Sequence, residues 1–283
     1  METSEVPEKS PGVWALYRQS LKPADSLFNL YFARPLAAPI VYLLSKTRVT
    51  PNQVTFISTL VMILAVAALS MVSGYLGVLV AVIGIELSYI LDCVDGQLAR
   101  VTGRSSAVGG DLDFMMDELK AYLLIAALGI RGAMTSSGVI QRTGWGEDTA
   151  TWRGLPEGPA WPLVICLLAL LVTASAISLT RFIRSERYAE ATGAPVQKHG
   201  QSAGEGRGGG PLWPLKALAR LVTQYPASLP LFALAGALDI FVYAYGILHA
   251  LYAGQAGLGV VLKLGRFAPQ DKPQRVSEDE ENG

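Results

Sequence analysis

The sequence is poor in charged residues and in cysteine. Charged side chains make up 16% of the 283 residues, against about 25% in an ordinary soluble domain. The 23 lysines and arginines balance the 23 aspartates and glutamates, which argues against a protein that binds nucleic acid through its overall charge. Cys93 and Cys166 lie in apolar segments and form no CxxC pair. Neither a zinc site nor a disulfide framework is therefore indicated.

The sequence is instead rich in long apolar runs. Hydrophobic residues account for 51% of the chain, and the mean hydropathy is +0.36. A helix of roughly 20 apolar residues crosses about 30 Å of hydrocarbon. We therefore predict an all-α polytopic membrane protein with six transmembrane helices, approximately at residues 53–72, 75–98, 110–131, 161–181, 224–239 and 240–262. Thr50 suits the N-cap of the first helix and Pro51 its first turn.

The remaining segments divide the chain into three parts. Residues 1–48 are expected to contain an amphipathic helix that lies in the membrane interface, and they lack the pattern of a cleavable signal peptide. Residues 49–265 form the six-helix transmembrane domain, with a Gly-rich linker at residues 202–211. Residues 266–283 are a charged tail that we expect to be disordered.

The basic residues predict the orientation. An even number of spans places both termini on one side of the membrane, and nineteen of the 23 lysines and arginines then fall on that side. Arg131, Arg142 and Arg153 fall on the other side. We expect the protein to be integral to the cytoplasmic membrane. Because lysine and arginine are enriched in cytoplasmic loops, both termini and the turn between the second and third spans should face the cytoplasm.

Four aspartates stand where the second and third spans face each other. Asp92 and Asp95 are three residues apart, and Asp113 and Asp117 are four apart, so each pair lies on one helical face. The polar turn VTGRSSAVGG between the pairs reverses the chain. We therefore expect the two acidic faces to meet near the cytoplasmic surface.

This much negative charge needs a counter-charge. An ionised carboxylate costs about 2.5–3.5 kcal/mol at the bilayer centre, and the basic residues between positions 73 and 130 are Arg100, Arg104 and Lys120. Carboxylates suit Mg²⁺ or Mn²⁺, and four of them suit two ions that clamp a phosphoryl group. Helix capping or a polar rim at the interface is the alternative, but neither requires a fixed spacing. Gly109 and Gly110 are expected to let the third helix pack closely on its neighbour.

The spacing of the acidic residues matches a specific sequence pattern. The pattern DGxxARx8GxxxDxxxD is filled by Asp95-Gly96, Ala99-Arg100, Gly109, Asp113 and Asp117, with Asp92 three residues before it. It resembles the signature of the CDP-alcohol phosphotransferase family. The resemblance implies a membrane enzyme of phospholipid biosynthesis that moves a phospho-alcohol group from a CDP-alcohol to an acceptor hydroxyl and releases CMP. It also implies two divalent cations, Mg²⁺ or Mn²⁺, and a homodimer.

The resemblance also assigns roles by position. The metal ligands would be Asp92, Asp95, Asp113 and Asp117, and Asp117 would also act as the general base. Cytidine diphosphate would be held by Pro51, Asn52, Gln53, Val54, Gly96, Arg100, Ser106 and Gly109.

The acceptor and the donor remain open at this point. Arg181, Arg184 and Arg187 recur every three residues at a cytoplasmic helix end, where they either anchor the helix to lipid headgroups or hold a phosphate of the acceptor. Lys120 either pairs with an aspartate or touches substrate. We favour CDP-diacylglycerol as donor and a phosphorylated polyol, such as inositol phosphate or glycerol phosphate, as acceptor. The alternative is a soluble donor of the CDP-inositol or CDP-choline type with a lipid or inositol-phosphate acceptor.

Two rivals come from other classes of protein. A cation transporter would need acidic or polar residues to continue across the bilayer, and beyond the cluster only Glu86 and Asp239 offer a carboxylate within the spans. A catalytically silent membrane scaffold would have no need of the complete aspartate pattern. Both are therefore disfavoured.

Overall fold

The structure is a computed structural model in which every described regular element is a helix. The predicted all-α class is thus confirmed for this part of the chain. The predicted linker at 202–211 and tail at 266–283 lie outside the described residues, and for residues 213–217 only the backbone is described. The described residues are 12–21, 25–140, 152–193 and 213–263.

Helices α3 (Pro51–Met71) and α4 (Gly74–Val101) form an antiparallel hairpin. The start of α3 is fixed by a capping box. Thr50 Oγ1 accepts a hydrogen bond from the Gln53 amide at 3.3 Å, and Gln53 Oε1 accepts one from the Thr50 amide at 2.9 Å. Two otherwise unpaired backbone donors are thereby satisfied. The predicted cap at Thr50 is confirmed.

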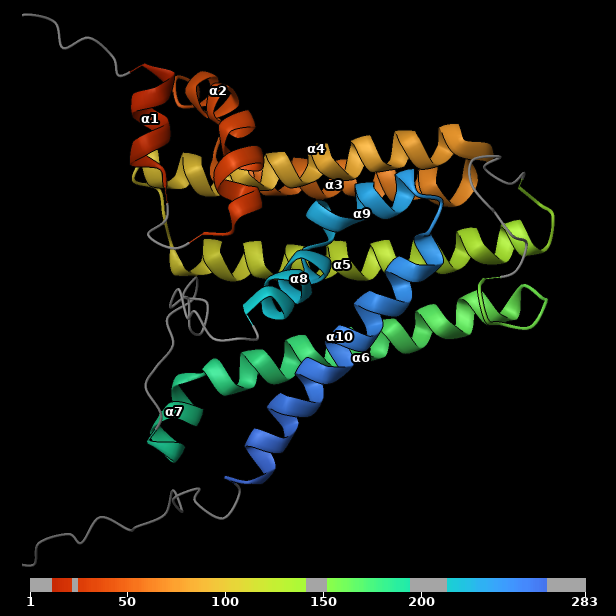
Figure 1. The fold of residues 1–283 in the computed structure, drawn as a ribbon. Helices are drawn as coiled ribbons and strands as arrows, with labels where there is room; N and C mark the ends of the chain where they lie inside the picture. The colour runs from red at the N-terminus through yellow and green to blue at the C-terminus, as the bar shows by residue number, and fades with distance from the viewer. Residues whose placement is uncertain (1–11, 22–24, 141–151, 194–212, 264–283) are drawn as a thin grey trace, which may run out of the picture.

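Three further long helices complete the bundle. Helix α5 (Ala107–Ser136) runs back beside α3, α6 (Ala160–Arg184) packs on α5, and α10 (Leu238–Val261) crosses α6 at an angle (Figure 1). Small residues allow the close approaches: a Cβ on Gly129 of α5 would lie 2.8 Å from the Cβ of Cys166 on α6. The apolar core between these helices includes Met62, Ile85, Leu128 and Phe241.

At the end of the bundle away from the aspartates, Arg131 of α5 fixes the turn between α3 and α4. Its guanidinium donates to the carbonyl oxygens of Leu69, Val72 and Gly74 at 2.8, 3.1 and 3.0 Å. The carbonyls of Leu69 and Val72 lie at the end of α3, where backbone acceptors lack helical partners, and Gly74 is the first residue of α4. Arg131 is therefore a buried structural residue, 5% exposed.

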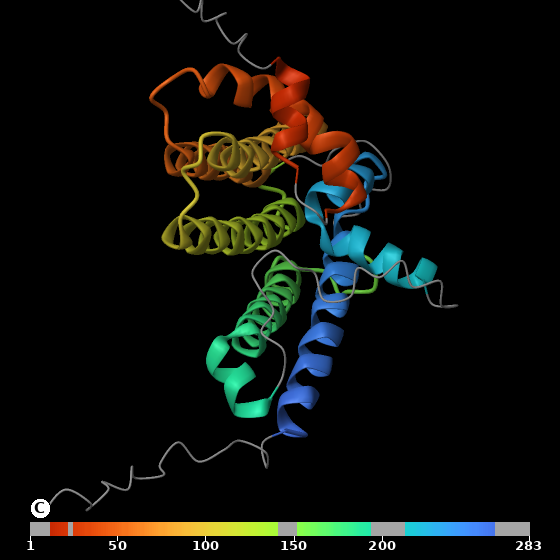
Figure 2. The same ribbon diagram turned by 90° about the vertical axis from the view of Figure 1, so that its left-hand side faces the viewer.

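The N-terminal region contains more than one helix. It comprises α1 (Val13–Gln19), the π-helical turn η1 (Asn29–Ala33) and α2 (Arg34–Leu44), which pack at the end of α4 that follows the aspartates (Figures 1 and 2). One face of α2 is buried against α3 and α4, and the other leaves large apolar side chains exposed. An amphipathic helix that lies in the membrane interface stays a prediction for this region, which the structure divides into three short elements. The exposed large apolar residues of this region are Trp14, Leu27, Tyr31, Phe32, Leu36 and Leu43.

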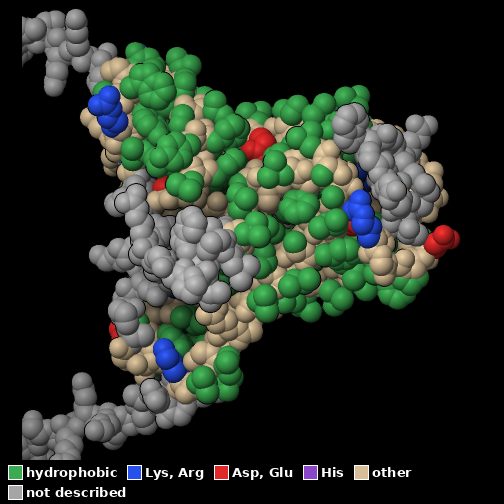
Figure 3. All heavy atoms as spheres, viewed as in Figure 1, with side chains coloured by type: hydrophobic (Ala, Val, Ile, Leu, Met, Phe, Trp, Pro, Cys, Tyr) green, Lys and Arg blue, Asp and Glu red, His purple; other side chains and the backbone are tan. Residues whose placement is uncertain are grey.

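Three of the described helices, α3, α4 and α6, are long and apolar enough to cross a membrane. Apolar side chains cover most of the face seen in Figure 3, with few charged ones among them. The predicted span at 224–239 is interrupted. Helix α9 (Tyr225–Leu234) has ten residues, about 15 Å at 1.5 Å per residue, and α10 begins at Leu238. Two shorter helices between α6 and α9 lie outside the predicted spans, namely α7 (Glu186–Thr192) and α8 (Trp213–Thr223).

Candidate active site

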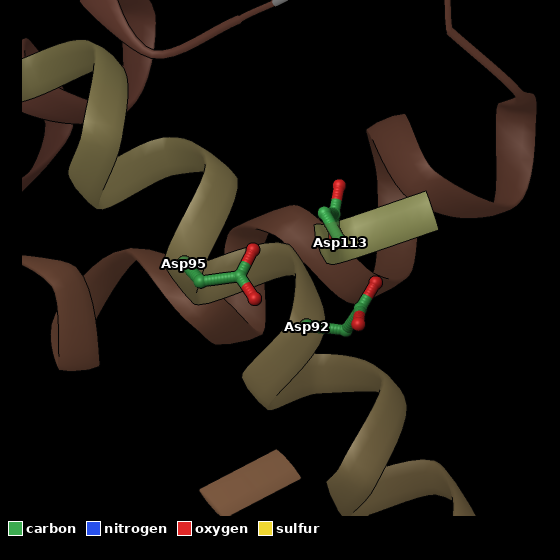
Figure 4. A group of neighbouring side chains, drawn as sticks. All are labelled: Asp92, Asp95 and Asp113. Atoms are coloured by element: carbon green, nitrogen blue, oxygen red, sulfur yellow. The ribbon is translucent and has the colours of Figure 1, made fainter. Parts of the chain in front are cut away.

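Three aspartates from two helices converge. Asp92 and Asp95 project from one side of α4 toward α5, which carries Asp113 (Figure 4). One carboxylate oxygen from each of the three lies within 4.8 Å of the others. The meeting follows from the chain reversal between α4 and α5, which places the end of one helix beside the start of the other. The expected juxtaposition of the two acidic faces is therefore present in the structure.

Asp95 is held in place by α3. It is 3% exposed, and Thr55 Oγ1 of α3 lies 2.6 Å from its Oδ2 and donates to it. A buried carboxylate requires such a partner, because a desolvated polar group without a hydrogen bond is costly. The first three long helices thus each contribute to the cluster.

Asp117 lies beside the cluster and not within its three members. Its neighbour is Lys120, whose Nζ is 3.6 Å from Asp117 Oδ1 and forms a close ion pair with Asp92. Lys120 is 1% exposed, whereas about half of the Asp117 side chain is exposed, 52%. Lys120 therefore links Asp117 to the cluster and supplies positive charge to two of the four aspartates.

The cluster opens into a pocket of about 160 Å³ between α3, α4 and α5. Asp95 and Asp113 belong to its wall, so the acidic cluster and the pocket form one site. Two of the predicted nucleotide residues lie elsewhere: Gln53 is engaged in the helix cap, and Val54 is 2% exposed in the apolar core. The other six line the pocket, namely Pro51, Asn52, Gly96, Arg100, Ser106 and Gly109.

The start of α5 shapes one wall of the pocket. Ser106 is the N-cap, and its Oγ accepts a hydrogen bond from the Gly109 amide at 3.0 Å. A Cβ at Gly109 would lie 2.9 Å from that Oγ and 3.4 Å from Asn52 Oδ1. A Cβ at Gly110 would meet nothing within 4 Å. The prediction that Gly110 allows close helix packing is wrong, because this residue lies at the open pocket.

Arg100 lies across the pocket wall formed by α4. A Cβ built on Gly96 would be 3.4 Å from Arg100 Nη1 and 3.7 Å from Nη2, so the guanidinium occupies the space that a side chain at Gly96 would fill. The Nε of Arg100 donates to the carbonyl oxygen of Ser20 at 2.6 Å. Sequence reasoning missed this contact, since 80 residues separate the partners and the acceptor is a backbone atom.

Two of the three predicted acceptor arginines lie in the last turn of α6, and the third lies in α7. Arg181 is exposed, and its guanidinium carbon lies 5.6 Å from the ring centre of Phe114, the residue after Asp113 on α5. This separation is within the range of a cation–π interaction. Arg184 is half-buried and ends α6, and Arg187 is exposed on α7. The structure thus brings Arg181 to the helix that carries Asp113.

The remaining carboxylates in the spans do not continue the cluster. Asp239 is held at the start of α10 by Arg153, with its Oδ1 2.5 Å from Nη1 and its Oδ2 3.0 Å from the Arg153 amide. Glu86 lies on α4 more than one turn before Asp92. These positions give no row of acidic groups across the bundle, which disfavours the transporter reading.

The cluster has the chemistry of a divalent-cation site. Its donors are hard oxygen atoms, which Mg²⁺, Mn²⁺ and Ca²⁺ prefer. Two oxygens bound to one ion at about 2.0–2.6 Å lie at most about 4–5 Å apart, and the observed limit of 4.8 Å agrees with this. Asp92, Asp95 and Asp113 therefore fit a divalent cation without rearrangement of the helices.

A carboxylate cluster that opens into a pocket with an arginine and a helix N-terminus has the features expected of a site for a phosphate-bearing ligand and a divalent cation. The family model of CDP-alcohol phosphatidyltransferases matches residues 48–248. The chain belongs to this family of transferases, which use divalent cations, a CDP-alcohol donor and an alcohol acceptor.

Curated relatives are similar over shorter regions. The chain is 36% identical over 123 residues to archaetidylinositol phosphate synthase of Aeropyrum pernix, covering 41% of this chain and 61% of that protein. It is 33% identical over 89 residues to the protein of the same name in Pyrococcus horikoshii, 31% and 45% of the two chains. A bifunctional IPC transferase and DIPP synthase of Archaeoglobus fulgidus is 32% identical over 83 residues, 29% and 16%. The matches thus span less than two thirds of each relative.

Proposed function

We propose that this protein is an integral membrane transferase that moves a phosphatidyl group from CDP-diacylglycerol to a hydroxyl of a phosphorylated polyol and releases CMP. The observation that supports it most is that the acidic cluster and the pocket share Asp95 and Asp113. A ligand in the pocket would present its phosphates to the carboxylates. A soluble CDP-alcohol donor is the second candidate, because the same wall of the pocket would accept its cytidine diphosphate.

The reaction is a substitution at phosphorus. The acceptor oxygen forms a bond to the phosphorus next to the alcohol moiety of the donor, and the bond from that phosphorus to the bridging oxygen breaks. The bridging oxygen leaves on CMP, and the acceptor hydroxyl gives up its proton. We assign this proton to Asp117, and the position of its exposed carboxylate one turn beyond Asp113 supports the assignment.

The donor would be held by groups on three helices. Arg100 has a planar fork of N–H donors that matches phosphate oxygens, and the start of α5 at Ser106 offers backbone N–H groups to an anion. Asn52 and Pro51 form the opposite wall. Asp92, Asp95, Asp113 and Asp117 would hold two divalent cations, Mg²⁺ or Mn²⁺, which when bound neutralise the diphosphate and the charge on the leaving group.

A phosphorylated acceptor is supported by the basic side chains near the cluster. Arg181 lies against Phe114, and Lys120 lies between Asp92 and Asp117. Arg184 ends α6, and Arg187 follows in α7. Two of the relatives are named archaetidylinositol phosphate synthase. We therefore infer inositol phosphate as the first acceptor to test, with glycerol phosphate as the second.

For the topology we propose six crossings, both termini in the cytoplasm, and a homodimer. Helices α5 and α10, with 30 and 24 residues, are long enough to join α3, α4 and α6 as spans. The interrupted segment α8–α9 would supply the remaining crossing. An even number keeps the basic segments on one side, as the positive-inside rule requires.

The function is tested by CMP release from the purified protein in detergent with Mg²⁺. CDP-diacylglycerol, CDP-inositol, CDP-glycerol and CDP-choline would each be combined with inositol, inositol phosphate, glycerol phosphate and diacylglycerol. We expect CMP from CDP-diacylglycerol with inositol phosphate, loss of turnover with EDTA, and recovery with Mg²⁺ or Mn²⁺. CMP release only from a soluble donor would select the second candidate. No binding of any cytidine nucleotide would remove the enzyme assignment altogether.

A further inference from the structure

We propose that the N-terminal segment formed by α1, η1 and α2 is a positioning element of the nucleotide site, and that it acts by holding Arg100. This inference rests on the proposed function of the pocket. It assigns a role in donor binding to a region outside the aspartate pattern, beginning with the backbone of Ser20.

The contact itself orients the arginine. Ser20 O accepts from the Nε of Arg100 at 2.6 Å, which leaves the two terminal nitrogens, Nη1 and Nη2, over Gly96 at the pocket wall. Those nitrogens form the end of the fork that binds two phosphate oxygens at once. A carbonyl bound at Nε therefore directs the phosphate-binding edge into the pocket.

The carbonyl of Ser20 is fixed in turn by α1. Ser20 is fully buried, and it ends α1 with its amide bonded to the carbonyls of Leu16 and Tyr17. Leu16 is the buried residue of the helix, 7% exposed. The Tyr17 hydroxyl donates to Leu30 O in η1 at 3.0 Å. The buried Leu16 side chain and the Tyr17 hydroxyl thus help to dock α1, and the carbonyl of its C-cap residue Ser20 accepts from Arg100.

A buried polar network supports the same face of α4. Arg34 of α2 is 3% exposed and forms a close ion pair with Asp25, and both lie near enough to Arg100 to interact with it electrostatically. Asn29 of η1 accepts from the Tyr89 hydroxyl of α4 at 2.5 Å. Asp25 neutralises the buried Arg34, which would otherwise repel Arg100. The N-terminal segment thus controls both the direction and the electrostatic surroundings of this arginine.

The expected consequence is tighter donor binding. A side chain that is already held in its binding geometry loses less conformational freedom when the ligand arrives. Release of the Ser20 contact would leave Arg100 charged and in the pocket, yet free to rotate. Nucleotide affinity should fall, while binding of the acceptor, which does not contact Arg100, should change little.

The test compares two substitutions on α1 in the full-length protein. Leu16→Asp places a charge on the buried face and should undock the helix. Gln19→Asp places the same charge on an exposed position of the same helix and serves as the control. CMP would be titrated with Mg²⁺ present by calorimetry in detergent, with thermal unfolding measured in parallel. We expect CMP to bind about tenfold more weakly to Leu16→Asp, and no more than about twofold more weakly to Gln19→Asp.

A second background isolates the route through Arg100. In Arg100→Lys the Nε donor is gone, so adding Leu16→Asp should weaken CMP binding by less than about twofold. If Leu16→Asp does not fold, Tyr17→Phe, which removes only the bond to Leu30, takes its place with a smaller expected loss of about threefold.

The outcomes separate this inference from the proposed function. An equal loss from Leu16→Asp in both backgrounds would mean that α1 acts on general stability, and would overturn the positioning role. Unchanged CMP binding in a folded Leu16→Asp protein would do the same. In either case CMP binding by the wild-type protein would leave the proposed function intact. Failure of the wild-type protein to bind CMP with Mg²⁺ would instead overturn the proposed function.

Discussion

The two ends of the helical bundle both bury charged side chains, but they balance them in different ways. At the far end, Arg131 is bonded to three backbone carbonyls and Asp239 is paired with Arg153. At the site end, four aspartates gather around one ion-pairing lysine of the described residues, Lys120. A buried charge whose partners are all supplied by the protein is tolerated within the fold, and removing a partner is costly. An excess of one sign calls for a counter-charge from a ligand.

The largest effect is expected when one carboxylate is removed from the acidic cluster. Asp113→Asn keeps the size of the side chain but loses a charged oxygen ligand, so CMP release should fall by about a thousandfold, as when a group that stabilises the transition state is lost. Asp111→Asn is the matched control, because it makes the same change at an exposed position on the same helix, outside the aspartate pattern. Turnover would be measured on purified folded protein with Mg²⁺. Substantial turnover by Asp113→Asn would rule out its role as a ligand.

The corresponding change at the far end should affect stability and not catalysis. Arg131→Met leaves the carbonyls of Leu69, Val72 and Gly74 without their donor. Hydrogen bonds to a charged group contribute about 1.5–3 kcal/mol each and are not additive, so we expect a loss of about 3 kcal/mol in the free energy of unfolding. Chemical unfolding in detergent would measure it.

Two further measurements complete this comparison. Arg131→Lys, which keeps the charge but loses the fork, should lose less stability than Arg131→Met. At a temperature where both variants are folded, their donor KM should match that of the wild type. A raised donor KM at unchanged stability would contradict the division between the two ends.

The division between the ends was partly predictable from the sequence. Helical spacing alone placed Asp92 with Asp95 and Asp113 with Asp117, and the polar turn between the spans required the pairs to approach each other. Thr50 and Pro51 marked the start of α3 through the local chemistry of the cap. These features depend on neighbouring residues and on one chain reversal, which a sequence displays directly.

Other features depend on contacts that no local pattern encodes. The bond from Arg100 to Ser20 joins a side chain to a backbone carbonyl 80 residues away. Val54 belongs to the same motif-like stretch as Pro51, yet it is buried in the apolar core and not in the pocket wall. The interruption of the segment 224–239 was also missed in part, because its apolar composition conceals the end of α9 at Leu234. Tertiary packing decides each of these cases.

A smaller effect is expected where the site meets the acceptor. Replacing Arg181 and Arg184 together by alanine should raise the KM for inositol phosphate about tenfold, the factor that corresponds to a loss of about 1.4 kcal/mol. The donor KM should change by less than about twofold. Inositol, which lacks the phosphate, provides the internal control, because its poor use should not become worse. Equal increases in both KM values would assign these arginines to membrane anchoring.

The smallest effect concerns the ion pair at the far end. Arg153 is about 38% exposed and the Asp239 side chain 9%, so solvent screens the pair and its contribution is expected to be about 1 kcal/mol or less. Asp239→Asn still accepts a hydrogen bond but loses the charge, so a small loss of stability should shrink further at about 1 M salt, where the Debye length is near 3 Å. Unfolding at low and high salt would measure this difference. A structural pair predicts an unchanged CMP release rate. If Asp239 instead belonged to an ion path, Asp239→Asn would alter cation flux in vesicles and leave stability unaltered. That result would restore the interpretation of the protein as a transporter.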